Sequence, residues 1–186
     1  MLLSAGLTAV VQPLAPPAEK QWADMVLAVR EQHAQWMGKA LEQAHQCPES
    51  DVPIGAVVIV DGKVVGAACN RREADADPTA HAEILALREA ARVRGRWNLT
   101  GCTLAVTLEP CTMCAGAIVL ARIEHLVVGA MDPKAGAAGS LYDLVREERL
   151  NHRVRLTTGV REIECAQMLR GFFRDLRERR KGLRAG

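Results

Sequence analysis

One continuous segment decides the fold of this chain of 186 residues. Residues 103–129 have the sequence TLAVTLEPCTMCAGAIVLARIEHLVVG, in which two apolar runs flank a stretch of small side chains. The runs at residues 103–108 and 125–129 have the length of buried strands, whereas residues 111–121 are typical of a buried, uncharged helix. A strand, a helix and a strand in this order predict parallel strands joined by a right-handed crossover.

The preceding segment supplies a hairpin and a second strand–helix–strand unit. Residues 54–60 and 63–69 are apolar and rich in β-branched side chains, and Asp61-Gly62 between them is a strong signal for a two-residue turn. Asp77-Pro78-Thr79 predicts the entry of a helix over residues 80–93, which Gly95 ends. Because this helix connects the hairpin to the next strand, parallel neighbouring strands are expected here as well.

Helices are also predicted before the first strand and after the last strand along the chain, and a short strand is predicted at residues 154–157. Apolar side chains recur at helical spacing before residue 46 and again after residue 162. They are Trp36, Met37, Ala40, Leu41 and Ala44 in the first helix, and Ile163, Ala166, Leu169, Phe172, Phe173 and Leu176 in the last. The predicted fold is α/β, a three-layer α/β/α sandwich around a mixed five-stranded sheet.

The composition is that of a globular protein with one domain, which we predict over residues 31–181 with a tail at 182–186. Hydrophobic residues make up 49% and charged residues 25%. The net charge of +2 neither requires nor excludes a nucleic-acid partner. Among six cysteines only Cys111 and Cys114 form a close pair, which does not match a secreted disulfide framework and indicates a reducing compartment.

The first 30 residues are expected to be a disordered leader. Residues 1–18 carry no charged side chain, and a secretory signal requires a basic segment that is missing before Lys20. One glutamine and three prolines between residues 12 and 17 are unfavourable in a membrane-spanning helix. An upstream start codon in the gene would equally explain the segment. We therefore expect a cytoplasmic protein.

Two short segments carry residues suited to metal chemistry. His81-Ala82-Glu83 and Pro110-Cys111-Thr112-Met113-Cys114 each lie at the start of a predicted helix. Both segments follow a strand or loop, so we expect the two helix starts to converge at one edge of the sheet. The positive end of a helix favours thiolates, and zinc prefers nitrogen and sulfur ligands arranged in a tetrahedron. The predicted zinc ligands are His81, Cys111 and Cys114.

Three protein ligands leave the fourth position for water, which is typical of a catalytic site. Zinc lowers the pKa of a bound water from about 15.7 toward about 7, and Glu83 is placed to act as general acid and base. Each part alone is less specific, because a Cys-x-x-Cys pair also occurs in redox proteins and structural zinc sites. A fourth ligand from one of the other cysteines, Cys69, Cys102 or Cys165, would close the site.

The two segments together resemble the H-x-E…P-C-x-x-C signature of zinc nucleobase deaminases. Further motifs make the chain similar to the bacterial tRNA-specific adenosine deaminase family of the cytidine/deoxycytidylate deaminase superfamily, from about residue 35 to about residue 180. These motifs are Asp51-Val52-Pro53-Ile54-Gly55-Ala56-Val57, Asn70-Arg71, Asp77-Pro78-Thr79-Ala80, Gly136-Ala137-Ala138-Gly139-Ser140 and Asn151-His152-Arg153-Val154.

The resemblance implies a cytidine-deaminase-like fold, one zinc ion per subunit and a homodimer. It also implies hydrolytic conversion of the wobble adenosine of tRNA anticodons to inosine, with tRNA-Arg as an expected substrate. In the zinc deaminases as a class, an activated water attacks C6 of adenine or C4 of cytosine while a glutamate transfers protons. In this chain that glutamate would be Glu83.

The resemblance further implies which residues contact the substrate. Asn70 would hydrogen-bond the flipped nucleoside, and small or apolar residues would line the base site, with three more residues near the anticodon nucleotides. The lining residues are Val52, Pro53, Ile54, Ala82 and Leu108, and the others are Asp132, Lys134 and Phe173. Ordinary structural roles explain several of these equally well: Asn70 as a turn residue, the apolar side chains as core, and Asp132-Pro133 as a turn.

A cluster of basic residues near the C-terminus bears on the substrate. Seven of the residues between 170 and 186 are basic, and such a cluster either binds phosphates or is the solvated end of a helix. Three functions therefore stay open. They are tRNA adenosine deamination, deamination of a free base or nucleoside such as guanine or cytosine, and a non-catalytic zinc-stabilised RNA-binding module. Glu83 argues against the last, because a structural site does not require a carboxylate beside its metal.

Overall fold

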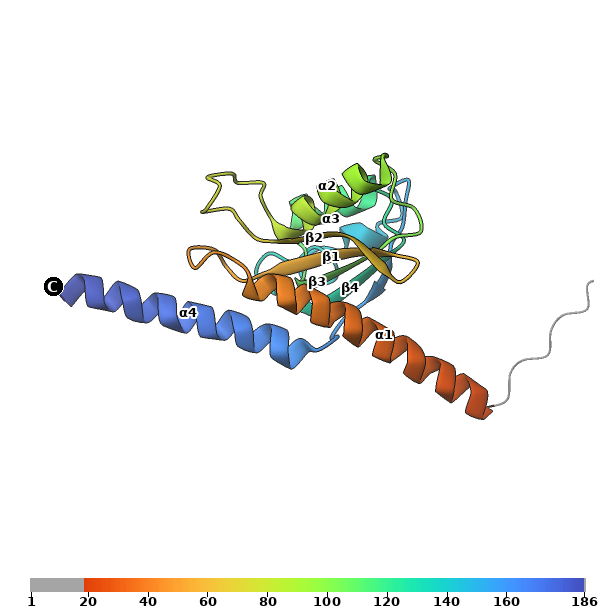
Figure 1. Ribbon diagram of the computed structural model, residues 1–186, viewed down its shortest axis with the longest axis horizontal. Coiled ribbons are helices and arrows are strands. Elements are labelled where there is room, and N and C mark those ends of the chain that lie inside the picture. Colours follow the sequence, from red (N-terminus) through yellow and green to blue (C-terminus); the bar gives the residue numbers. More distant parts are fainter. Residues whose placement is uncertain (1–18, 186) are drawn as a thin grey trace, which may run out of the picture.

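The computed structural model describes residues 19–185, so residues 1–18 of the expected leader lie outside it. Helices α2 and α3 cover one face of the sheet, and α1 and α4 lie on the other (Figure 1). This arrangement confirms the predicted α/β/α sandwich. The elements are α1 (Glu19–His45), β1 (Gly55–Val60), β2 (Lys63–Cys69), α2 (Ala82–Arg94), β3 (Thr103–Leu108), α3 (Thr112–Leu120), β4 (His125–Ala130), the 3-10 helix η1 (Leu144–Arg146), β5 (Arg155–Thr157) and α4 (Glu162–Ala185).

The five strands are arranged in the order β2-β1-β3-β4-β5. Strand β1 pairs antiparallel with both β2 and β3, whereas β3, β4 and β5 are parallel. The β3–α3–β4 unit thus joins adjacent parallel strands, as predicted. The prediction of parallel neighbours was wrong for the unit through α2. The hairpin keeps β1 beside β2, and β3 pairs with the other edge of β1, so β1 separates β2 from β3.

The first helix is longer than predicted. It begins at Glu19, so the expectation of a disordered leader was wrong for residues 19–30. No proline or glycine interrupts the chain between residues 19 and 37, and Glu19 in the first turn suits the helix dipole. This half of α1 projects beyond the sheet (Figure 1), and Trp22 and Leu27 on it are about half exposed. No helix within residues 19–185 is both long and apolar enough to cross a bilayer.

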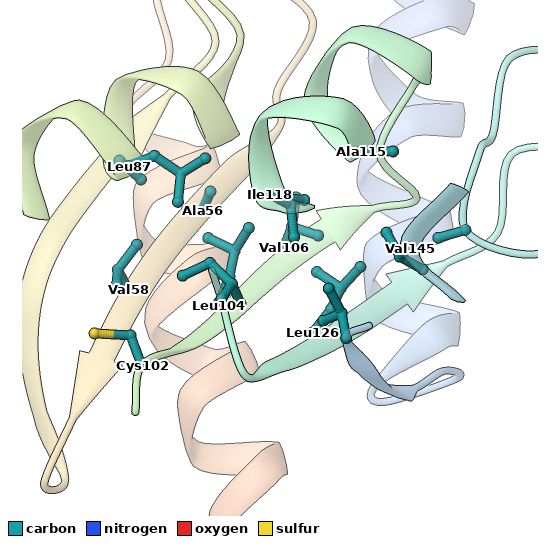
Figure 2. Close-up of a cluster of buried hydrophobic side chains, with 14 of the residues drawn as sticks. Ala56, Val58, Leu87, Cys102, Leu104, Val106, Ala115, Ile118, Leu126 and Val145 are labelled. Atoms are coloured by element: carbon teal, nitrogen blue, oxygen red, sulfur yellow. The ribbon is translucent and has the colours of Figure 1, made fainter. Parts of the chain in front are cut away.

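Two hydrophobic clusters hold the layers together, one on each face of the sheet. Ala56 and Val58 of β1 belong to the cluster under α2 and α3, while Val57 and Ile59 belong to the cluster under α1 and α4. Figure 2 shows the first cluster, in which Ile118 of α3 lies among side chains of the central strands. Because both faces are covered, the central strands are apolar on both sides, and polar groups gather at the strand ends.

Helix α2 packs closely against strand β2 of the sheet. A Cβ atom at Gly66 of β2 would lie 2.3 Å from the carbonyl oxygen of Ala86 and 2.7 Å from the nitrogen of Ala90. Only glycine allows the helix to approach the strand so closely. The N-terminus of α2, with the His81 and Glu83 segment, is thereby held at the edge of the sheet near the end of β3.

Two histidines are buried side by side between α1 and the sheet. His33 is 8% and His125 is 5% exposed, and the centroids of their rings lie 4.9 Å apart. The Nε2 atom of His125 lies 2.9 Å from the hydroxyl of Thr157. Burial first, and then the positive charges of Arg155 and His33, lower the pKa of His125 to about 4; burial also lowers the pKa of His33. Both imidazoles are therefore neutral at neutral pH.

We expect these histidines to make the fold sensitive to acid. His125 takes up a proton near pH 6.5 in the unfolded chain but only near pH 4 in the folded protein, so the unfolded state binds more protons between these values. The free energy of unfolding should fall as the pH is lowered through this window, by up to about 3 kcal/mol for His125. Urea unfolding at pH 7 and pH 5 measures the part of this loss that occurs above pH 5, which is about 2 kcal/mol.

The variant His125→Gln should lose clearly less stability between the two pH values than the wild type. His45→Gln, which changes an exposed histidine on α1, is the matched control and should follow the wild type. An equal loss in His125→Gln and the wild type would contradict the assignment.

Candidate metal centre and active site

The predicted zinc ligands come together at the starts of two helices. His81 is the N-cap residue of α2 and Cys111 that of α3, both with extended backbone, and Cys114 lies in the first turn of α3. The Nδ1 atom of His81 is 3.7 Å from the sulfur of Cys111 and 3.5 Å from that of Cys114. Zinc bonds of about 2.3 Å to sulfur and about 2.0 Å to nitrogen at the tetrahedral angle would separate such atoms by about 3.5 Å. The geometry therefore fits zinc.

Within residues 19–185 no other cysteine, histidine or carboxylate joins this group of three, whose ligand atoms all lie within 4.8 Å of one another. Cys69, Cys102 and Cys165 are free thiols outside it. Three protein ligands would leave the fourth position of a bound zinc ion for water, as in an open zinc site rather than a closed structural one.

The thiol groups of the cluster are prepared for a cation. The hydrogen bond with Cys114 is the main cause that lowers the pKa of Cys111 to about 3, with a further contribution from His81. The same contact with Cys111, together with burial, raises the pKa of Cys114. A divalent cation at the cluster would be held by two thiolates and an imidazole.

Glu83 lies in the first turn of α2, two residues after His81, and is 4% exposed. Burial is the main cause that raises the pKa of its carboxyl group, and the backbone and His81 oppose this effect. A buried carboxyl group with a raised pKa gains and loses a proton more readily near neutral pH, as a general acid and base requires.

A cavity of about 450 Å³ opens over the cluster. The cavity is lined by nine of the predicted site residues and by eight residues that were not predicted as site residues. The predicted ones are Val52, Ile54, Asn70, His81, Glu83, Leu108, Cys111, Asp132 and Phe173, and the others are Ser50, Arg72, Glu73, Glu109, Ala135, Phe172, Leu176 and Arg180. Three predicted contacts lie elsewhere: Pro53 lines a neighbouring hollow, Lys134 lines a groove beside α4, and the side chain of Ala82 is fully buried in the core.

Three comparisons agree with this geometry. A family model described as MafB19-like deaminase matches residues 31–177. The tRNA-specific adenosine deaminase of Bacillus subtilis (strain 168) is 48% identical over 150 residues, which covers 80% of this chain and 93% of that protein. The chain belongs to the tRNA-specific adenosine deaminase family. The cluster of His81, Cys111 and Cys114 is the His/Cys/Cys type of zinc site found in this family and its cytidine-deaminase relatives.

Solved structures of related deaminases have the same fold as this member of the tRNA-specific adenosine deaminase family. A structure from a study of A-to-I editing by tRNA:A34 deaminases is 43% identical, covers 73% of this chain and 99% of that chain, and has a TM-score of 0.70. A guanine deaminase from Nitrosomonas europaea is 28% identical, covers 75% of this chain and 83% of that chain, and has a TM-score of 0.63. The cytidine-deaminase-like fold is thus confirmed.

Two buried carboxylates had no assigned role in the sequence analysis; Glu109 lines the cavity and Asp51 lines the neighbouring hollow. Asp51, 1% exposed, accepts hydrogen bonds from the backbone of Glu73 and Ala74 at 2.9 Å, and from the side-chain nitrogen of Asn70 at 3.4 Å. Asp51 thereby orients Asn70, which is one of the predicted substrate-binding residues. Because Asp51 can only accept, the amide group of Asn70 faces it with its nitrogen.

Glu109 is the second of these carboxylates and is 3% exposed. Burial alone would raise the pKa of its carboxyl group, but hydrogen bonds from Ser140, Asp132 and Ala138 lower it below its usual value. A signal for this residue exists in the sequence, since Glu109 is the only charged residue between residues 103 and 121. A lone charge in a buried segment must find partners, and here they are backbone N–H groups.

A second hollow, the basic groove, lies beside the cavity along α4. It has a volume of about 550 Å³ and is lined by Lys134, Leu169, Arg170, Phe173, Arg174 and Arg177. Phe173, which is 42% exposed, lines both the cavity and the basic groove. Phe172, Leu176 and Arg180 face the cavity from another side of the same helix. Side chains of helix α4 thus line both the cavity and the basic groove.

Proposed function

We propose that this chain hydrolyses adenosine to inosine at the wobble position of tRNA anticodons, with tRNA-Arg among its substrates. The observation that carries the proposal is the His81–Cys111–Cys114 cluster with Glu83 beside it at the cavity. Names of relatives support the substrate, since the B. subtilis protein is a tRNA-specific adenosine deaminase and the solved relative edits A34 of transfer RNA.

The chemistry divides between the metal and Glu83. His81, Cys111 and Cys114 would hold a zinc ion, which when bound would lower the pKa of a coordinated water toward about 7. Glu83 accepts a proton from the water and delivers it to N1 of the adenine as the oxygen adds to C6. It then carries the second proton to the leaving amino group. The C6–N bond breaks, ammonia leaves, and the carbonyl group of inosine remains.

The cavity walls suit a flat purine. Val52, Ile54 and Leu108 present partly exposed apolar side chains into it, which can pack against the faces of a base. Asn70, held by Asp51, offers a polar group at the edge of the same space. We assign binding of the base to these side chains, and contacts with neighbouring nucleotides to Asp132, Lys134 and Phe173.

The basic groove favours RNA over a free base. Among the ion pairs of residues 19–185, none involves Lys134, Arg170 or Arg177, and Arg174 pairs only with the adjacent Asp175 at 3.2 Å. Unpaired cations grouped beside an active site attract phosphates, which a free base does not have. A strand whose flipped nucleoside enters the cavity would pass Phe173 and place its next phosphates in the groove.

We expect removal of two groove cations to weaken RNA binding selectively. The double variant Arg170→Ala with Arg177→Ala should bind an anticodon stem-loop at least about tenfold more weakly at low salt, because two phosphate contacts are lost. The slope of the logarithm of the binding constant against the logarithm of the salt concentration should also become shallower by about 0.7 for each lost contact. Fluorescence anisotropy over a range of salt concentrations measures both quantities. Arg92→Ala, which removes an exposed arginine from α2, should leave them unchanged. An unchanged salt slope in the double variant would argue against phosphate contacts in the groove.

Incubation of the purified protein with an anticodon stem-loop of tRNA-Arg tests the function itself. The expected product is inosine at the wobble position, which is copied as guanosine on reverse transcription. No conversion, together with rapid release of ammonia from guanine or cytosine, would favour the free-base enzyme. RNA binding without release of ammonia from any substrate would favour the RNA-binding module.

We further propose that residues 31–181 form the deaminase domain and that the protein is a cytoplasmic homodimer. The match of the family model to residues 31–177 supports the domain limits. The resemblance to the family supports the dimer, and sedimentation at micromolar concentration tests it.

A further inference from the structure

The carboxylate of Glu109 is bound entirely by groups from one loop. Its oxygens accept hydrogen bonds from the backbone nitrogens of Asp132 at 2.8 Å, of Ala138 at 2.9 Å and of Ser140 at 2.9 Å. The hydroxyl of Ser140 also donates to it. None of the ion pairs within residues 19–185 involves Glu109, so backbone and hydroxyl dipoles alone balance its charge. These partners all lie in residues 131–140, the segment after β4, which we call the specificity loop.

The specificity loop is also joined directly to the metal-binding segment. The nitrogen of Ala137 donates to the carbonyl oxygen of Pro110 at 2.8 Å, and Cys111 forms an isolated β-bridge with Gly136. A Cβ atom on Gly136 would lie 2.2 Å from a carboxylate oxygen of Glu109. The carboxylate is therefore packed against bare backbone, and the loop can approach Glu109 closely only because this residue is glycine.

The specificity loop carries groups that face two different parts of the substrate site. Asp132 and Ala135 line the cavity above the metal cluster, and Lys134 lines the basic groove. Glu109 itself precedes Cys111 by two residues. One side chain thus connects the position of a metal ligand to the position of the loop that would contact the RNA.

We propose that Glu109 is a positioning residue, whose buried carboxylate sets the specificity loop at the correct distance from the metal centre for binding of the RNA. This inference rests on the proposed function, and it adds a role for a residue that the sequence analysis did not assign to the site. A carboxylate is required because all four partners donate. Glutamine has the same shape but offers one acceptor oxygen, and its NH₂ group would face N–H donors.

The variant Glu109→Gln tests the proposal with two measurements. For deamination of the anticodon stem-loop, KM should rise about tenfold or more, while kcat falls less than about threefold and zinc stays near one per chain. Amide hydrogen exchange, followed by NMR, should become at least about tenfold faster at Asp132, Ala138 and Ser140. The amides of Val127 and Val128 in β4 should be unaffected. Glu124→Gln, at an exposed glutamate, is the matched control and should match the wild type in every measurement.

A milder variant keeps the test decisive if Glu109→Gln does not fold. Ser140→Ala removes one donor without burying a new polar group, and it should raise KM and speed exchange at Ala138 and Ser140 in the same direction but to a smaller extent. Unchanged exchange and unchanged KM would overturn the proposal. So would a loss of zinc or kcat with the loop amides still protected, since Glu109 would then serve only the metal segment.

Failure of the proposed function would look different. In that case the wild type makes no inosine in the stem-loop. The exchange measurement needs no substrate and would still show whether Glu109 holds the loop.

Discussion

Glu83→Gln should abolish deamination of the anticodon stem-loop while the protein still binds about one zinc ion per chain. The amide of glutamine preserves the shape and burial of the side chain but cannot accept a proton from water and pass it to the base. General acid and base catalysis by one side chain contributes about 10²–10⁴-fold, and Glu83 serves both proton transfers, so we expect a loss at or above the upper end of this range. Inosine formation under single-turnover conditions measures it.

Glu42→Gln, which changes an exposed glutamate on α1, should keep the rate of the wild type. A rate within tenfold of the wild type in Glu83→Gln would mean that another group transfers the protons. Loss of zinc from this variant would instead place Glu83 among the metal ligands.

Cys111→Ser should remove both the metal and the activity. Cys111 supplies one of the two sulfur donors of the cluster, and serine offers zinc a hydroxyl that stays protonated at neutral pH. We expect zinc to fall below about one tenth per chain after dialysis, and inosine formation to become undetectable. Cys111 is only partly buried, so the fold should survive the exchange.

Elemental analysis of the dialysed protein measures the zinc, and circular dichroism checks the fold. Cys47→Ser is the control, because Cys47 is a partly exposed free thiol outside the cluster. Retention of zinc and activity in Cys111→Ser, or their loss in Cys47→Ser, would contradict the ligand set.

Much of the fold followed from local sequence patterns. A few adjacent residues were enough to predict strands β3 and β4, the uncharged helix α3 and the Asp61-Gly62 turn. The structure contains all of them. The order of the strands is not a local property. Local patterns do not show that β3 pairs with β1 rather than with β2, and for this reason β2 and β3 were wrongly expected to be neighbours.

The metal cluster was predictable because its ligands lie at helix starts with a fixed spacing. The residues that support it were harder to find, because Asp51 and Glu109 bind the backbone of irregular loops, and such contacts produce no periodic pattern. Ala82 was expected in the base site because of the resemblance to the family, and the helix turns its side chain into the core.

X-ray absorption at the zinc edge tests the metal centre most directly. We predict one nitrogen from an imidazole at about 2.0 Å, two sulfurs at about 2.3 Å and one light oxygen ligand. A shell with three or four sulfurs, a second imidazole in place of the oxygen, or no sulfur at all would contradict an open site formed by His81, Cys111 and Cys114.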